Sequence, residues 1–202
     1  MKFIIFNGSL KQEGESNTYT LCEMLDTAFK KLKVESEIVT LNEIDFEATT
    51  DNVNDALTPY IKKIFDADGV IFATPIWWGV HSCWIQGLIE RLDYIHTWSD
   101  DNNFQPFYNK VFGSCVSGGG DGFQHIHGIF FNFACNLGFT VPPQCNVESK
   151  AQGRDNILSD DPTIEQIKIC AQNMYVYGSL IKSGNPAKYA RHGSIDISGK
   201  DK

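Results

Sequence analysis

The chain opens with Met1-Lys-Phe-Ile-Ile-Phe-Asn-Gly-Ser9-Leu-Lys-Gln-Glu-Gly-Glu-Ser16-Asn-Thr18, a strand, turn and helix start that decides its fold. The short apolar run is typical of a strand buried on both faces, and periodic apolar residues from Leu21 onward predict a helix. Gly8 permits a tight exit, and residues 16–18 offer polar side chains where the helix begins. Because free N–H groups and the positive helix end favour an anion, this segment predicts a phosphate-binding turn.

Several common phosphate sites are excluded by residue identity. No Gly-x-Gly-x-x-Gly and no Gly-Lys-Ser/Thr follows the first strand, and no Cys is followed six residues later by Arg. The strand end also lacks the paired acids of a magnesium-binding receiver domain. Neutral donors suit a phosphate monoester that stays bound. A serine-capped helix without a ligand is the alternative.

Composition narrows the class of protein. A chain of 202 residues fits one domain that needs no disulfide or metal to fold. Its net charge of −8 argues against binding to nucleic acid or to an anionic membrane. Six cysteines at irregular spacings, without Cys-x-x-Cys, fit reduced thiols better than a disulfide framework or a zinc site, so no residues are assigned to a metal. Reduced thiols indicate a cytoplasmic protein. No apolar stretch approaches the ~18–20 residues that span a bilayer.

Strand and helix patterns alternate along the chain. Strands are predicted over 3–6, 35–41, 69–74, 110–117 and 138–141, the last resuming near Val147. Helices are predicted from about 17 to 32 and over 54–66, 82–94, 125–137 and 161–181. This alternation indicates a parallel sheet, whose ligands bind at the carboxyl ends of the strands.

The third strand leads into Thr74-Pro-Ile-Trp77-Trp78-Gly-Val-His81. Successive side chains in an extended segment diverge, so both indoles cannot point into the core, and one is expected to border the cleft as a wall for a planar heterocycle. The alternative is that the two Trp side chains only pack over the end of the sheet and bind no ligand. Bulky residues 76–78 are expected to resist positive φ.

The fourth strand leads into Ser117-Gly-Gly-Gly-Asp121-Gly122. Four glycines in five residues carry a large entropic cost on folding, which favours close approach of the backbone to a ligand over a plain connection.

Together these loops resemble those of the flavodoxin-like NAD(P)H-dependent FMN reductases and quinone reductases. The most specific part is Thr74-Pro-Ile-Trp-Trp78 with Glu90-Arg91 downstream. The resemblance implies a doubly wound α/β fold with five parallel strands in the order 2-1-3-4-5 and helices on both faces. It covers residues 1–182, which leaves a C-terminal tail over 183–202.

The resemblance also implies an FMN site, with NADH or NADPH as co-substrate and a quinone, nitroaromatic or flavin as acceptor, in a homodimer or homotetramer. No nucleic-acid or membrane partner is expected. His81 is the candidate to donate a proton to the reduced acceptor. The residues implicated in holding FMN are Ser9, Ser16, Asn17, Thr18, Pro75, Ile76, Trp77, Trp78, Gly79, Ser117, Gly118, Gly119, Gly120 and Asp121.

One residue departs from the pattern of this family. Gln86 stands where many relatives carry Lys, which removes a charge contact. Two other functions also remain open. A one-electron carrier of the flavodoxin type would use the same loops, and a scaffold that has lost FMN would keep the fold.

Overall fold

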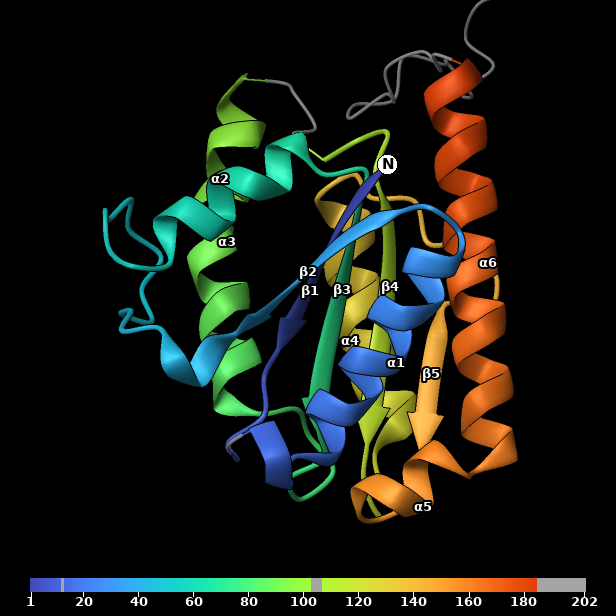
Figure 1. Cartoon of the computed structure of the whole chain (residues 1–202). Helices are drawn as coiled ribbons and strands as arrows, with labels where there is room; N and C mark the ends of the chain where they lie inside the picture. The colour runs from blue at the N-terminus through green and yellow to red at the C-terminus, as the bar shows by residue number, and fades with distance from the viewer. Residues whose placement is uncertain (12, 103–106, 185–202) are drawn as a thin grey trace, which may run out of the picture.

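The computed structural model describes residues 1–11, 13–102 and 107–184. Five parallel strands form one sheet in the order β2-β1-β3-β4-β5, as predicted (Figure 1). The strands are β1 (Lys2–Asn7), β2 (Glu35–Thr40), β3 (Gly69–Pro75), β4 (Val111–Ser117) and β5 (Asn146–Ser149).

Helices cover both faces of this sheet. The longer ones are α1 (Asn17–Lys31), α2 (Thr58–Asp66), α3 (Cys83–Asn102), α4 (Phe123–Asn136) and α6 (Asp161–Gly184). The short ones are η1 (Glu13–Glu15), η2 (Leu41–Glu43) and α5 (Arg154–Leu158). Helices α1, α5 and α6 pack on one face, and α2, α3 and α4 on the other.

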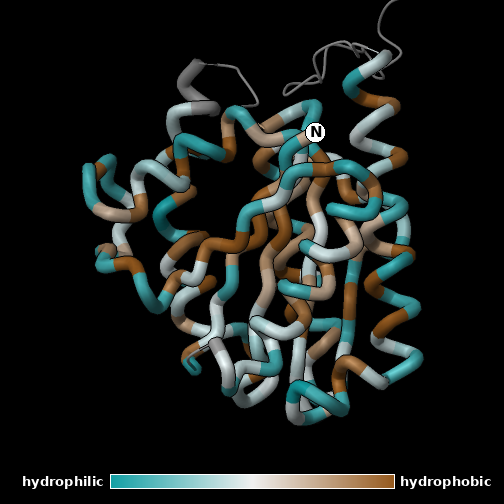
Figure 2. The backbone as a smooth tube through the Cα atoms, viewed as in Figure 1, coloured by the Kyte–Doolittle hydropathy of each residue, from teal (hydrophilic) through white to brown (hydrophobic). Residues whose placement is uncertain are grey.

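The central strands are buried on both faces, so alternate side chains enter two separate cores. On β3, Val70 and Phe72 face the α2–α4 side, whereas Ile71 and Ala73 face the α1 and α6 side. Figure 2 shows hydrophobic residues along the inner strands of the sheet. At the carboxyl ends of β3 and β4, Pro75 pairs with Ser117, so both strands end at the same edge of the sheet.

The fifth strand was predicted over 138–141 with a resumption near Val147, and only this second part is confirmed. Thr140 forms only an isolated bridge with Val111, and β5 runs over Asn146–Ser149 beside β4. Pro142 and Pro143 follow Thr140, and because they have no N–H group they cannot extend the ladder there.

Helix α2 also begins later than predicted, at Thr58. The Asp55 carboxylate accepts hydrogen bonds from the N–H groups of Leu57 and Thr58, and Pro59 occupies the first turn, which is a favourable helix start. Arg91 of α3 is buried and forms an ion pair with Asp55. Burial raises the pKa of Asp55, but the Arg91 and backbone hydrogen bonds outweigh it, so the pKa lies below its usual value.

Helix α3 continues to Asn102, well past the predicted end at 94, and α6 ends at Gly184. Nearly all of the predicted tail lies outside the described residues. Over the part of the chain that the structure describes, no helix is long and apolar enough to cross a membrane.

Candidate functional site

A cavity of about 380 Å³ lies where the carboxyl ends of the strands meet. This volume falls in the range of about 300–1,000 Å³ that is common for small-molecule sites. Its walls come from the first loop, the Trp-containing second loop, the Gly-rich third loop and the segment after β5. The lining residues are Ser9, Leu10, Lys11, Ser16, Asn17, Thr18, Pro75, Ile76, Trp77, Ser117, Gly118, Gly119, Lys150 and Gln152.

The first loop presents a helix N-terminus to this cavity. Ser16 is the N-cap of α1, and its Oγ accepts a hydrogen bond from the Tyr19 N–H (3.0 Å). The Ser16 hydroxyl donates to Ser9 Oγ (2.7 Å). Helix geometry leaves the N–H groups of Asn17 and Thr18 without intrahelical acceptors, so these groups are available to an anion.

Side chains of the first loop tie it to two other segments. Thr18 Oγ1 and Ser117 Oγ share a buried hydrogen bond of 2.7 Å. The Asn17 amide donates to Gln152 Oε1 (2.7 Å) and accepts from the Gly153 N–H (3.0 Å). The Ser16 hydroxyl proton is therefore engaged by Ser9, whereas either hydroxyl of the Thr18–Ser117 pair can be the donor. The backbone N–H groups at the start of α1 are available to an anion beside them.

The second loop forms a two-residue turn. The Trp77 N–H donates to the Val80 carbonyl (2.8 Å), and the Val80 N–H donates back to Trp77 (3.0 Å). Trp78 and Gly79 at the tip have φ of 51° and 80°, the conformation of a type I′ turn. The expectation that residues 76–78 resist positive φ is therefore wrong for Trp78, because the two hydrogen bonds of the turn and the glycine beside it outweigh the steric penalty there, whereas Ile76 and Trp77 have no positive φ.

The two indoles differ in their surroundings. Trp77 is 45% exposed and lines the cavity, whereas Trp78 is 100% exposed and does not line it. As expected, the indoles do not both enter the core, and Trp77 is the one that borders the cleft.

Glycines of the third loop allow close packing around the cavity. A Cβ on Gly118 would lie 2.8 Å from the Ile76 side chain, and a Cβ on Gly122 would lie 2.5 Å from the Gly79 carbonyl oxygen. The second and third loops are thus locked together. A Cβ on Gly119 would meet nothing within 4 Å, so the loop leaves open space at this position.

His81 lies outside the cavity lining. Its Nε2 is 2.8 Å from Gln86 Oε1, and its ring contacts Phe130 with centroids 5.3 Å apart. The Gln86 amide donates to Glu90 Oε1 (2.9 Å), which fixes Gln86 Oε1 as the acceptor and therefore places the His81 proton on Nε2. Gln86 thus has a local role in place of the charge contact that Lys would make.

Ten of the implicated residues line the cavity: Ser9, Ser16, Asn17, Thr18, Pro75, Ile76, Trp77, Ser117, Gly118 and Gly119. The others, Trp78, Gly79, Gly120, Asp121 and His81, do not. Four lining residues were not predicted: Leu10, Lys11, Lys150 and Gln152. Lys150 and Gln152 follow β5, at the carboxyl end of the strand, where ligands of this sheet type bind.

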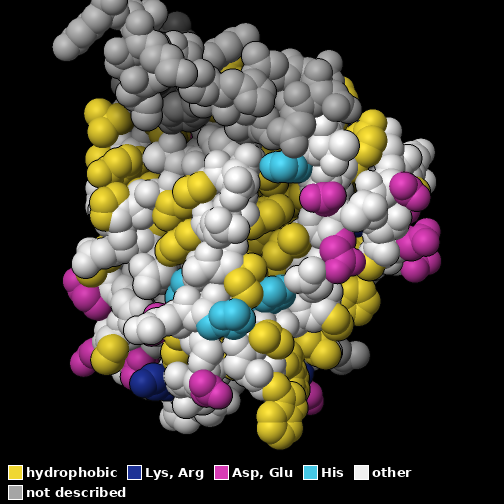
Figure 3. All heavy atoms as spheres, turned by 180° about the vertical axis from the view of Figure 1, so that it is seen from behind, with side chains coloured by type: hydrophobic (Ala, Val, Ile, Leu, Met, Phe, Trp, Pro, Cys, Tyr) yellow, Lys and Arg dark blue, Asp and Glu magenta, His cyan; other side chains and the backbone are white. Residues whose placement is uncertain are grey.

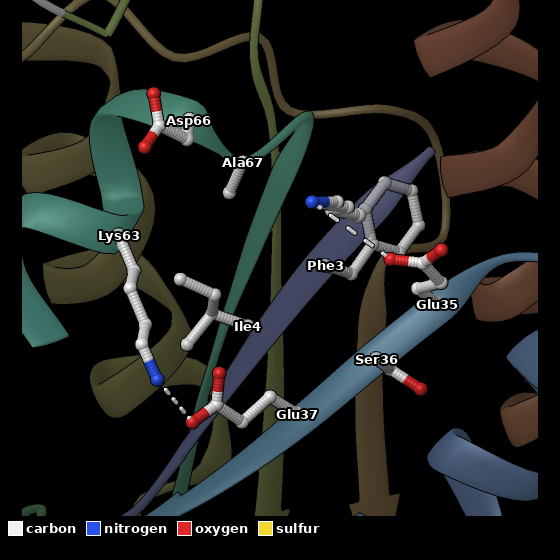
Figure 4. A pocket seen from close by; sticks show the side chains of 9 residues that line it. Phe3, Ile4, Glu35, Ser36, Glu37, Lys63, Asp66 and Ala67 are labelled. Atoms are coloured by element: carbon white, nitrogen blue, oxygen red, sulfur yellow. Dashed lines mark hydrogen bonds and ion pairs between the residues drawn. The ribbon is translucent and has the colours of Figure 1, made fainter.

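A second hollow, of about 300 Å³, lies at the opposite end of the sheet (Figure 4). Its lysines face carboxylates, with Lys63 Nζ 2.6 Å from Glu37 and Lys2 Nζ 4.0 Å from Glu35. Because these cations are already paired, this hollow is not an anion site.

A third hollow, of about 420 Å³, runs between α3 and α4, on the face where Figure 3 shows apolar side chains gathered. It lies away from the carboxyl ends of the strands, where ligands of this sheet type bind. Over the described residues, no group of three or more side chains could hold a metal ion.

Comparison with known proteins adds to this geometry. The family model of NADPH-dependent FMN reductases matches residues 1–152. The 8-demethyl-8-aminoriboflavin-5′-phosphate synthase of Streptomyces davaonensis is 28% identical over 156 residues, which are 71% of this chain and 61% of that protein. The chain therefore spans less than two thirds of that relative's length.

Two solved structures share the fold. The crystal structure of RosB with the bound intermediate 8-demethyl-8-formylriboflavin-5′-phosphate has a TM-score of 0.79 at 20% identity and covers 99% of this chain and 93% of its own. The flavoenzyme NAD(P)H:(acceptor) oxidoreductase FerB of Paracoccus denitrificans has a TM-score of 0.65 at 15% identity, with coverage of 90% and 97%.

Proposed function

The chain belongs to the NADPH-dependent FMN reductase family, whose model matches residues 1–152, and on this premise we propose that its cavity holds FMN. The protein would use this cofactor to pass two electrons from NADPH or NADH to a small acceptor. A quinone, a nitroaromatic or a free flavin is the proposed acceptor class, and a homodimer or homotetramer is the proposed assembly.

The cradle at the α1 N-terminus carries this proposal. The N–H groups of Asn17 and Thr18 would donate hydrogen bonds to one anionic group, and Lys11 lines the same cavity. Only one such helix end lines the cavity, and the first loop has no dinucleotide fingerprint. These donors fit the terminal phosphate of FMN better than the pyrophosphate of FAD.

The remaining walls fit a planar ring. Trp77 and Ile76 supply an apolar wall. Because Gly119 has no side chain, a bound ring could approach its backbone closely. FMN would supply the hydride chemistry when bound, and the protein would orient the ring and leave one face accessible. His81 stays the proposed proton donor to the reduced acceptor, although it lies outside the cavity lining and its Nε2 bonds to Gln86.

The cavity assignment is tested by filling it. Gly119 lines the cavity, and a Cβ there meets no atom within 4 Å, so Gly119→Leu adds bulk to the cavity lining without a clash in the fold. Gly128→Leu on α4 is the matched control, since a Cβ there also meets nothing. We expect Gly119→Leu to abolish FMN binding by fluorescence quenching and Gly128→Leu to leave it unchanged. Equal binding by both variants would place FMN elsewhere.

A second candidate is an enzyme that alters a flavin phosphate itself, which is favoured by the similarity to the 8-demethyl-8-aminoriboflavin-5′-phosphate synthase of Streptomyces davaonensis. In that case the cavity would hold a flavin phosphate as substrate. Mass spectrometry of the flavin recovered after turnover separates the two functions. A reductase returns FMN of unchanged mass.

A further inference from the structure

Lys150 is the first residue after β5, and its side chain lies across the third loop. A Cβ built on Gly120 would be 3.1 Å from Lys150 Cε and 3.5 Å from its Nζ. Gly120 therefore leaves the space that the lysine stem occupies. Lys150 also lines the cavity, so its ammonium group is held at the third-loop side of the site.

The cavity is cationic in an acidic protein. The chain has a net charge of −8, yet the lining residues include Lys11 and Lys150 and no Asp or Glu. The structure gives the ammonium group of Lys150 no hydrogen bond or ion pair with any described residue. A lysine placed in this way is available to a negatively charged ligand.

The two lysines sit at different walls of the cavity. The backbone N–H of Lys11 donates to Ser9 Oγ (3.1 Å), which places this residue in the first loop beside the phosphate cradle. Lys150 lies against Gly120 of the third loop instead. With FMN in the cavity, the phosphate needs the first wall, and the ring lies toward the second and third loops.

We propose that Lys150 places its positive charge beside the flavin ring and stabilises the negative charge that the ring acquires on reduction. This inference rests on the proposed function. A cation near the ring interacts more favourably with the reduced, anionic form than with the neutral oxidised form. By linkage, Lys150 then tightens binding of the reduced cofactor relative to the oxidised cofactor and raises its midpoint potential.

The test compares Lys150→Met, Lys150→Arg and Lys11→Met in the FMN-loaded protein, with Lys168→Met on α6 as a control for loss of a surface charge. The readouts are the midpoint potential and the dissociation constants of FMN and riboflavin. For Lys150→Met we expect the preference for reduced over oxidised FMN to fall about tenfold, which corresponds to a potential about 30 mV lower. Lys150→Arg keeps the charge and should keep the potential.

Lys11→Met is expected to weaken FMN several-fold, to leave riboflavin unchanged and to leave the potential near that of the wild type. An unchanged potential in Lys150→Met overturns the proposal. If Lys150→Met instead weakens FMN but not riboflavin, Lys150 is a phosphate ligand, and if only the KM for NADPH rises, it contacts the nicotinamide substrate. Failure of the wild-type protein to bind FMN would overturn the proposed function itself, before any variant is compared.

Discussion

Thr18 Oγ1 and Ser117 Oγ lie 2.7 Å apart, and both residues are buried. This hydrogen bond joins the first turn of α1 to the last residue of β4, so it fixes the phosphate cradle relative to the third loop. Because the partners are 99 residues apart in the chain, the cavity depends on the whole sheet.

Thr18→Val should lower the free energy of unfolding by about 1–3 kcal/mol, because it leaves the Ser117 hydroxyl buried without a partner. FMN affinity should fall as the two loops lose their fixed spacing. Thr18→Ser keeps the hydroxyl and serves as the control. Urea unfolding and FMN titration measure the two effects. If Thr18→Val is as stable as the wild type, the hydrogen bond does not contribute to stability.

Trp78 and Trp77 should respond differently to substitution. Trp78→Gly removes a fully exposed indole and relieves its positive φ, so the melting temperature should stay the same or rise. If the indole contacts aromatic acceptors, their KM should rise by a factor of about 5, the equivalent of a stacking contact of about 1 kcal/mol. Trp77→Ala should loosen FMN instead. Loss of thermal stability alone in both variants would make the loop purely structural.

His127 should make the protein sensitive to acid. Its Nδ1 is 2.7 Å from Ser114 Oγ, and burial lowers the pKa of the ring to about 4. Glu148 lies 3.7 Å from Nε2, but the ring is neutral at pH 7, so this contact is not an ion pair there. Below a pH of about 6.5 the unfolded chain binds a proton that the folded ring does not accept.

The free energy of unfolding should therefore fall as the pH drops from 6.5 to 4, by up to about 3 kcal/mol from this group. His127→Gln should flatten that part of the pH dependence, measured by urea unfolding at a series of pH values. His125→Gln, at an exposed position on the same helix, should leave the slope unchanged. An unaltered slope in His127→Gln would assign the acid sensitivity to other groups.

Asp55→Asn should destabilise the protein by about 3–5 kcal/mol, because it leaves the buried Arg91 guanidinium without its counter-ion. The segment before α2 should loosen first, since Arg91 also donates to the carbonyls of Glu47 and Val53. Hydrogen exchange over residues 44–57 would detect this. Protection equal to that of the wild type would contradict the role given to the pair.

The sequence predicted the sheet well wherever local pattern and tertiary structure agree. The first, third and fourth strands are continuous apolar runs because they are buried on both faces, and this pattern is visible without a structure. The fifth strand is four residues long at an edge, with alternate residues buried. Its pattern is weak, so the prediction began it at 138–141 and resumed it near Val147. Only the second part forms the strand, because Pro142 and Pro143 prevent the ladder from continuing after Thr140.

The site was predicted only in part, for related reasons. Loops that follow correctly placed strands supplied residues such as Ser9, Trp77 and Gly118, which do line the cavity. Lys150 directly follows the part of the fifth strand predicted near Val147, but it was not assigned to the site. The hydrogen bond between Thr18 and Ser117 depends on three-dimensional packing, so no local pattern could show that these two side chains meet.

Anaerobic titration of the FMN-loaded protein with NADPH, and separately with NADH, tests the central claim most directly. If the protein is a two-electron reductase, about one equivalent of at least one of these donors should bleach the flavin absorbance. Addition of a quinone should then restore the absorbance. A flavin that is bleached by dithionite but by neither nicotinamide would contradict the reductase assignment and favour an electron carrier.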